Sequence, residues 1–180
     1  MGKFEQVTLD SILSPAAAET ARQLGSHRLA SVSPDSLEAV SLRDLADFWN
    51  KARDGMPLPS AGALDPVKIP KHLSQSFLIS VDHDPLSFEF RIIGEDPTEA
   101  FGVNVAGMTV TDIEFNGLPA GKMMHESYAW IVDQRQPVAF SGPNETLQAG
   151  YKRQEIIYLP FSNGSCQVSR ILGASIYYRT

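Results

Sequence analysis

Residues 77–92 read FLISVDHDPLSFEFRI, and this stretch decides the fold class. Phe77–Val81 is a short apolar run of the length typical of a buried strand. Residues 88–92 alternate apolar and charged side chains, which is the period of two expected for a half-buried strand. Asp84-Pro85 lies between the two runs and marks a turn. The stretch therefore predicts two strands joined by a short connection.

Three more strand candidates follow towards the C-terminus. They are Pro137–Ser141, Gln154–Phe161 and Val168–Tyr178. Asn163-Gly164 lies between the last two, and this dipeptide is a strong signal for a β-hairpin. The last two strands are therefore expected to pair with each other.

Two amphipathic helices are predicted, one before and one after the first pair of strands. The first covers Leu42–Arg53, with Ser41 and Asp44 in the spacing of a capping box. Its apolar face has the spacing i, i+3, i+4 and i+7 and consists of Leu45, Phe48, Trp49 and Ala52. The second helix covers Pro119–Gln134, with proline at its first position. Its apolar face is centred on Ala120, Met124, Tyr128 and Ile131.

The order of elements is helix, two strands, helices, three strands. It predicts an α+β fold with a five-stranded, mostly antiparallel sheet and helices on one face, preceded by the amphipathic N-terminal helix. We place this domain at residues 37–180. Residues 1–36 form an N-terminal extension that we expect to be partly helical or flexible, with a short helix over Pro15–Leu24.

Composition narrows the class of protein. Hydrophobic residues make up 43% and charged residues 20%, a mix typical of globular domains, and the net charge of −6 argues against nucleic-acid binding. No apolar run approaches the length needed to span a bilayer, and the N-terminus lacks the features of a secretory signal. Cys166 is the only cysteine, so an internal disulfide is excluded. We therefore expect a cytoplasmic protein that binds neither membranes nor nucleic acid.

Several spaced motifs point to one family. The chain resembles a family of short bacterial PAS proteins, best represented in alphaproteobacteria, and it has their order of helices and strands. The segments that carry the resemblance are Leu42–Trp49, Gly55–Pro59, Leu64–Pro66 with Ile69-Pro70, Phe90–Gly94, Phe101-Gly102 with Gly107-Met108, Leu159–Ser162 and Arg170–Ala174. The resemblance implies a non-enzymatic sensory or interaction module with a pocket between the sheet and the crossover helices.

Strand and helix alternation predicts which side chains face that pocket. The predicted cofactor-binding group is Phe90, Ile92, Phe140, Tyr158, Leu172, Tyr128 and His125. The first six either line a cavity or fill a core, since apolar side chains in a small domain do either. The cofactor, if there is one, stays unknown at this point.

His125 is the residue tested most closely for chemistry. Haem-binding PAS domains carry their axial histidine on the long helix, and imidazole is a natural iron ligand. His125, however, lies to one side of the helix's apolar face, so we expect a partly exposed histidine instead. A flavin adduct needs a cysteine on an earlier helix, and Cys166 lies elsewhere. The histidines His27, His72, His83 and His125 are scattered, so no metal site is predicted.

The expected function is a stand-alone regulatory module that acts on a partner signalling protein, with or without a small-molecule ligand. We predict a homodimer that uses residues 1–36 or the first helix through Leu45, Phe48, Trp49 and Ala52, since large aromatic side chains dominate interfaces. Two alternatives remain. One is an isomerase- or lyase-like enzyme on a cone-shaped α+β fold, which needs a buried carboxylate facing Tyr128 or Tyr158. The other is a purely structural dimerisation unit. No catalytic motif is present, so we predict no enzyme.

Overall fold

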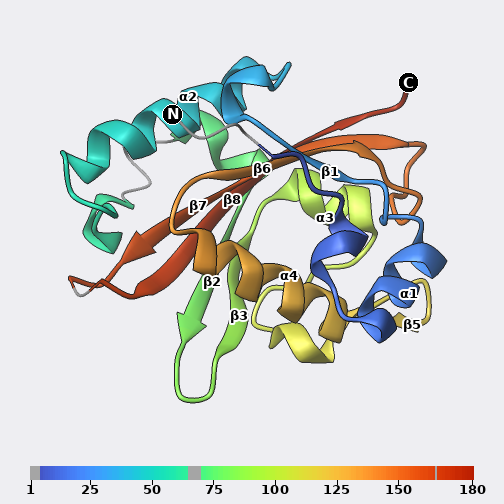
Figure 1. Ribbon diagram of the computed structural model, residues 1–180. Coiled ribbons are helices and arrows are strands. Elements are labelled where there is room, and N and C mark those ends of the chain that lie inside the picture. The colour runs from blue at the N-terminus through green and yellow to red at the C-terminus, as the bar shows by residue number, and fades with distance from the viewer. Residues whose placement is uncertain (1–4, 65–69, 165) are drawn as a thin grey trace.

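The sheet has six strands, all paired antiparallel, in the order β1-β6-β7-β8-β2-β3 (Figure 1). The computed structural model describes residues 5–64, 70–164 and 166–180. The strands are β1 (Ala30–Val32), β2 (Ser76–Asp82), β3 (Ser87–Ile93), β6 (Val138–Pro143), β7 (Arg153–Ser162) and β8 (Val168–Tyr178). A separate two-stranded ribbon pairs β4 (Glu114–Phe115) with β5 (Leu118–Pro119).

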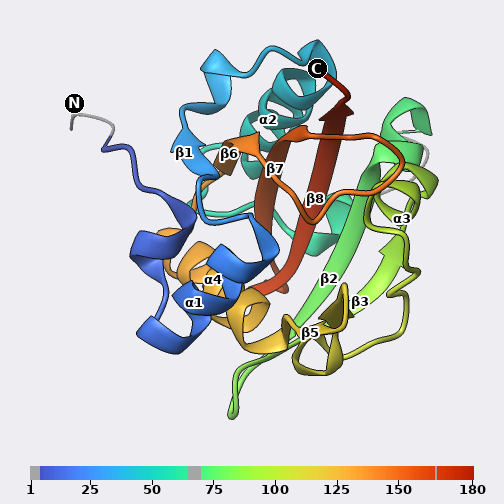
Figure 2. The same cartoon turned by 90° about the vertical axis from the view of Figure 1, so that its right-hand side faces the viewer.

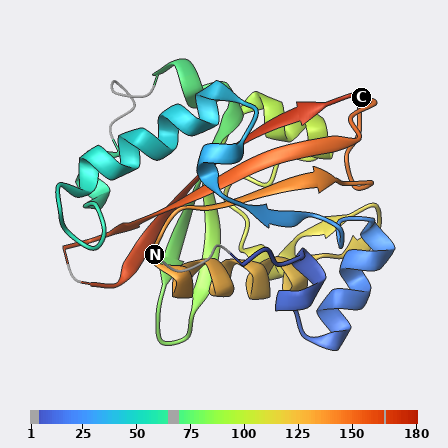
Figure 3. The same cartoon turned by 45° about the horizontal axis from the view of Figure 1, so that its top comes forward.

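The helices lie on both sides of the sheet. They are α1 (Pro15–Leu24), α2 (Val40–Arg53), α3 (Glu95–Phe101) and α4 (Gly121–Gln134). Short 3₁₀ turns occur at Leu9–Ile12, Pro34–Ser36, Ala61–Ala63, Pro70–Gln75 and Val110–Asp112. Helices α1 and α4 cover one face, and α2 runs across the opposite face (Figures 1 and 3). The α+β class and the amphipathic helix ahead of the main sheet strands are therefore confirmed. Among the described residues, no helix is both long enough and apolar enough to cross a membrane.

The sheet contains one strand more than predicted. All five predicted strands form, but β1 from the N-terminal extension pairs with β6, with Ser31 opposite Phe140. No strand was predicted in residues 1–36, because three residues are too few to show an alternating pattern. Long-range pairing at the sheet edge creates this strand.

The N-terminal extension packs into the same core as the rest of the chain. Helix α1 occupies its predicted range and lies against α4 (Figure 2). The Glu126 carboxylate on α4 accepts hydrogen bonds from the Ser14 backbone N–H at 2.7 Å and from the Ser14 hydroxyl at 2.8 Å. Buried residues of the extension that belong to the common core are Leu9, Ala17, Ala21, Leu24 and Leu29.

Both long helices begin differently from the prediction. The capping box predicted at Ser41 and Asp44 does not form. Helix α2 starts at Val40, and its N-cap residue, Ala39, makes no side-chain hydrogen bond to the helix. Helix α4 starts at Gly121, and Pro119 belongs to β5 instead. A Cβ at Gly121 would lie 2.3 Å from the Thr111 carbonyl oxygen, so the chain passes too close here for a side chain. Asp65 and Pro66, which belong to the segments that carry the family resemblance, lie outside the described residues.

Helix α2 covers the chain's own sheet, which corrects the predicted interface. Leu45 and Trp49 are 0% and 4% exposed, so they are not available to a second chain. The Trp49 indole Nε1–H donates to the Pro160 carbonyl oxygen on β7 at 2.6 Å. Phe48 and Ala52 are half-buried. The sheet needs its outer face covered, and α2 does this from within the same chain. A homodimer stays a prediction, but Leu45 and Trp49 are not part of its interface.

Candidate functional site: a cavity between the sheet and helix α4

A cavity of about 120 Å³ lies between the sheet and the helices that cover its inner face. Cavity-facing side chains of the strands come from β2, β3, β6, β7 and β8, and the helical wall comes from α3 and α4. Leu9, Ser26 and Leu29 of the N-terminal extension close one side. The aromatic residues of the lining are Phe77, Phe90, Phe101, Phe115, Tyr128, Phe140, Tyr158 and Tyr177. The described part of the lining contains no charged side chain.

Gly173 on β8 allows one wall of the cavity to form. It lies opposite Tyr158 on β7 and opposite Phe77 on β2. A Cβ at Gly173 would lie 2.0 Å from the nearest Phe77 ring atom, so the ring occupies the space that a side chain would take. Glycine therefore leaves room for the Phe77 ring next to β8, where it contributes to the lining.

Most polar groups of the lining bond to the protein itself. The Ser127 hydroxyl donates to the Met123 carbonyl oxygen at 2.7 Å. The Thr146 hydroxyl donates to the Leu24 carbonyl oxygen at 3.0 Å. The Asn144 amide nitrogen donates to the Gln154 side-chain oxygen at 2.9 Å. These bonds rigidify the cavity wall.

The tyrosines of the lining differ in their surroundings. The rings of Tyr128 and Tyr158 lie beside each other, with their centroids 5.8 Å apart. The Tyr177 hydroxyl is buried and has no partner within normal hydrogen-bond geometry. The Ser175 hydroxyl, two residues away on β8, donates instead to the Glu155 carbonyl oxygen. A buried hydroxyl without a partner lowers the stability of the folded protein by about 1–3 kcal/mol. Tyr177 is therefore an unsatisfied polar group of this cavity.

Alkaline pH is expected to unfold the protein through these tyrosines. Burial raises the pKa of Tyr128, Tyr158 and Tyr177 above their ordinary value. Their stabilising effect is therefore complete below about pH 10, where unfolded tyrosine ionises, and is lost as the pH rises through the folded-state values. Urea unfolding at stepped pH, with tyrosinate absorbance as a second signal, measures this. The slope of unfolding free energy against pH should flatten in Tyr158→Phe; an unchanged slope contradicts the assignment.

The structure places four of the predicted cofactor-binding residues on the cavity. Phe90, Phe140, Tyr128 and Tyr158 all line it. That they bind a ligand stays a prediction.

The other three residues of that group lie outside the lining, and two of them are the apolar residues Ile92 and Leu172. Ile92 is 59% exposed, because a bulge between β2 and β3 shifts the register and gives its inward position to Ile93. Leu172 is buried, but it pairs with Leu159 and lies outside the lining. Its neighbour Gly173 pairs with the cavity-lining Tyr158. The prediction therefore assigned the residues of β8 to the wrong faces of the sheet, one position out of phase. The correct phase places Tyr177 on the cavity, a residue that was not among those predicted to face it.

His125 does not reach the cavity. It is half-buried on α4, with its ring against Phe88 at a centroid distance of 5.2 Å. It is absent from the cavity lining, which agrees with its expected place at the helix edge. Within the described residues, no group of three or more His, Cys, Asp or Glu side chains is placed to hold a metal.

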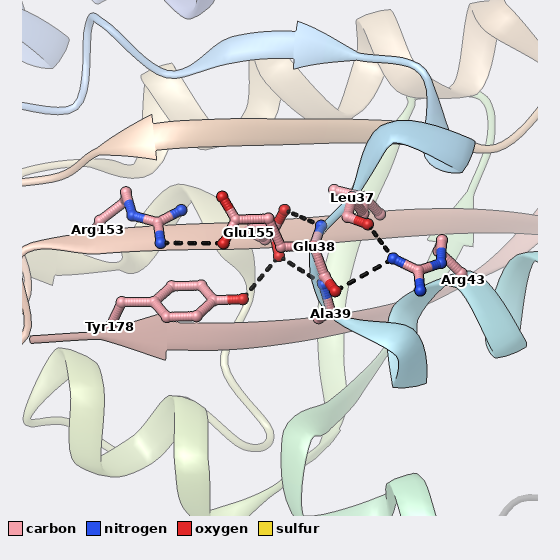
Figure 4. Close-up of polar contacts among 7 residues, drawn as sticks. All are labelled: Leu37, Glu38, Ala39, Arg43, Arg153, Glu155 and Tyr178. Carbon is pink, nitrogen blue, oxygen red and sulfur yellow. Dashed lines mark hydrogen bonds and ion pairs between the residues drawn. The ribbon is translucent and has the colours of Figure 1, made fainter. Parts of the chain in front are cut away.

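A second buried polar cluster lies on the opposite face of the sheet, under α2 (Figure 4). Glu155 on β7 is 2% exposed, and of the residues that the structure describes it is the only buried Asp or Glu. Its carboxylate accepts hydrogen bonds from the backbone N–H groups of Glu38 at 2.7 Å and Ala39 at 3.0 Å. The Tyr178 hydroxyl donates to it at 2.8 Å.

Charged neighbours complete the cluster. Arg43 donates to the carbonyl oxygens of Leu37 and Glu38, and the Arg153 guanidinium lies 3.4 Å from the Glu38 carboxylate. Burial and the Glu155 carboxylate raise the pKa of Tyr178 to about 12. The cluster holds the start of α2 on the sheet. Because Glu155 points away from the cavity, the carboxylate that an isomerase-like site needs is absent from the described lining.

Comparison with known proteins identifies a family over most of the chain. A family model described as PAS domain matches residues 37–176. No curated protein and no solved structure matches the chain. The matched region contains the strands β2, β3, β6 and β7, all but the last two residues of β8, and the helices α2–α4, but α1 and β1 lie outside it.

Proposed function

We propose that this chain, which belongs to the PAS domain family, is a regulatory sensor that binds a small molecule in the cavity and changes its contacts with a partner protein. The cavity carries the proposal. Protein interiors are normally packed with few voids larger than a water molecule, whereas this one has about 120 Å³ of space. Aromatic side chains surround it on several sides, as in many small-molecule sites.

The cavity's size limits what it holds. Binding sites for drug-sized ligands begin at roughly 300 Å³, so a cavity of about 120 Å³ suits a single-ring or short-chain molecule. An apolar cavity of about 150 Å³ is known to bind benzene, which sets the scale.

Strand β7 connects the cavity with the outer face of the sheet, because it has side chains on both. Its alternating side chains put Ile156 and Tyr158 on the cavity and Glu155 under α2. A ligand that shifts β7 changes both faces at once, because the strand is shared. The ligand then selects between two positions of α2 that differ in affinity for a partner.

A cavity-filling variant tests the proposal. Native mass spectrometry of the purified protein should show a small bound mass, or ligand-observed NMR should show saturable binding of small neutral aromatic molecules. Ile156→Phe should abolish the binding, because the larger ring occupies the cavity. The matched control is Ile92→Phe, the same change at an exposed position of β3, which should leave binding intact. If neither method detects binding that Ile156→Phe removes, the proposal is wrong and a structural role is favoured.

A further inference from the structure

The cavity's polar groups specify its ligand more closely than its size does. Four of the residues that the structure describes have a buried side-chain polar atom without a partner, and of these Tyr177 lines the cavity. The other three, His27, His125 and Ser169, lie outside the lining. A phenol hydroxyl has one hydrogen to donate, and here nothing in the protein accepts it in normal geometry.

The serine and threonine hydroxyls next to it are already used. Ser127 and Thr146 each donate to a backbone carbonyl oxygen. Among the cavity-lining hydroxyls that the structure describes, that of Tyr177 is the one that is both buried and without any partner. The Phe101 ring, at a centroid distance of 6.1 Å, and the Tyr151 ring, at 5.7 Å, lie beside the Tyr177 ring.

The charge of the ligand follows from the lining. None of the cavity-lining residues that the structure describes carries a charge. An ion that left water for this cavity would lose its hydration without gaining a counter-ion, which is strongly unfavourable. The ligand is therefore neutral, and a carboxylate or an ammonium group is selected against.

We infer that the cavity binds a small neutral molecule with one aromatic or aliphatic ring and one hydrogen-bond acceptor, such as a carbonyl oxygen, and that Tyr177 donates the hydrogen bond that orients it. The inference rests on the proposed small-molecule sensing, and it adds the chemical class of the ligand and the residue that selects it.

Three probes of nearly equal shape test the class. Acetophenone carries a carbonyl oxygen, α-methylstyrene replaces that oxygen with a CH₂ group, and benzoate adds a charge. Dissociation constants are measured by ligand-observed NMR for the wild type, Tyr177→Phe and Tyr151→Phe. Tyr177→Phe should weaken acetophenone binding about tenfold, the effect of one hydrogen bond, and leave α-methylstyrene within about twofold. Tyr151→Phe, outside the lining, should change neither, and benzoate should bind the wild type at least about a hundredfold more weakly than acetophenone.

The stability of the unliganded variant gives a second readout. Because the Tyr177 hydroxyl has no partner, Tyr177→Phe should keep or raise the thermal midpoint. A purely structural tyrosine would lower it, which would contradict the inference.

The outcomes separate this inference from the proposed function. If α-methylstyrene binds and Tyr177→Phe affects both probes equally, the inference is overturned while the sensor proposal stands. Wild-type protein that binds none of the probes also overturns the ligand class, and the co-purifying mass and Ile156→Phe then decide the proposed function separately.

Discussion

Glu155→Ala is expected to destabilise the folded protein by about 3 kcal/mol or more, since a hydrogen bond to a charged group contributes about 1.5–3 kcal/mol. The Glu155 carboxylate takes the place of a helix cap for α2, accepting the N–H groups of Glu38 and Ala39 (Figure 4). It also accepts the Tyr178 hydroxyl. Alanine leaves all three donors without their partner at a position that is 2% exposed. Urea unfolding measures the loss.

Two further variants define the cause. Glu155→Gln keeps the shape of the side chain but turns one acceptor oxygen into a donor facing another donor, so we expect about half the loss of the alanine variant or more. Glu114→Gln, at an exposed position on β4, is the control and should change stability by less than about 0.5 kcal/mol. Equal effects at Glu155 and Glu114 would contradict the capping role.

Trp49→Ala is expected to cost about 3–5 kcal/mol, the range for removing a large aromatic side chain from a core. Trp49 is 4% exposed between α2 and β7, and its indole N–H donates to the Pro160 carbonyl oxygen. The variant therefore loses both apolar contact and a hydrogen bond. Trp49→Phe keeps most of the apolar contact and should lose about 1–3 kcal/mol, because the carbonyl oxygen loses its partner.

Trp130 supplies the comparison. It is half-buried on α4, where its ring lies 6.2 Å from that of Phe140. Trp130→Ala should cost less than half of what Trp49→Ala costs, as measured by urea unfolding followed by circular dichroism. A similar loss at both positions would mean that the contact between α2 and the sheet contributes little, and that Trp49 acts only through its size.

Strand positions could be read from the sequence, but the direction of each side chain could not always be. The strand predicted at Val168–Tyr178 forms over that range. Within it, Leu172 was assigned to the cavity although Gly173 and Tyr177 occupy that face, because an apolar strand buried on both faces shows no alternation. At Ile92 the alternation was clear, but it predicted the wrong face of the sheet for this side chain. The bulge in β3 inserts one residue, and only the pairing with β2 reveals it.

The sequence by itself determined the α+β class, the main strands, the ranges of two amphipathic helices to within a few residues, and four aromatic members of the cavity. These features depend on local periodicity, which a single segment contains. The tertiary structure alone decided that α2 covers its own sheet, that β1 joins that sheet, and that Tyr177 faces the cavity without a partner. It also decided the start of α2, where the capping carboxylate lies 117 residues along the chain from the Glu38 N–H that it binds. Such contacts join distant segments, so no local pattern can encode them.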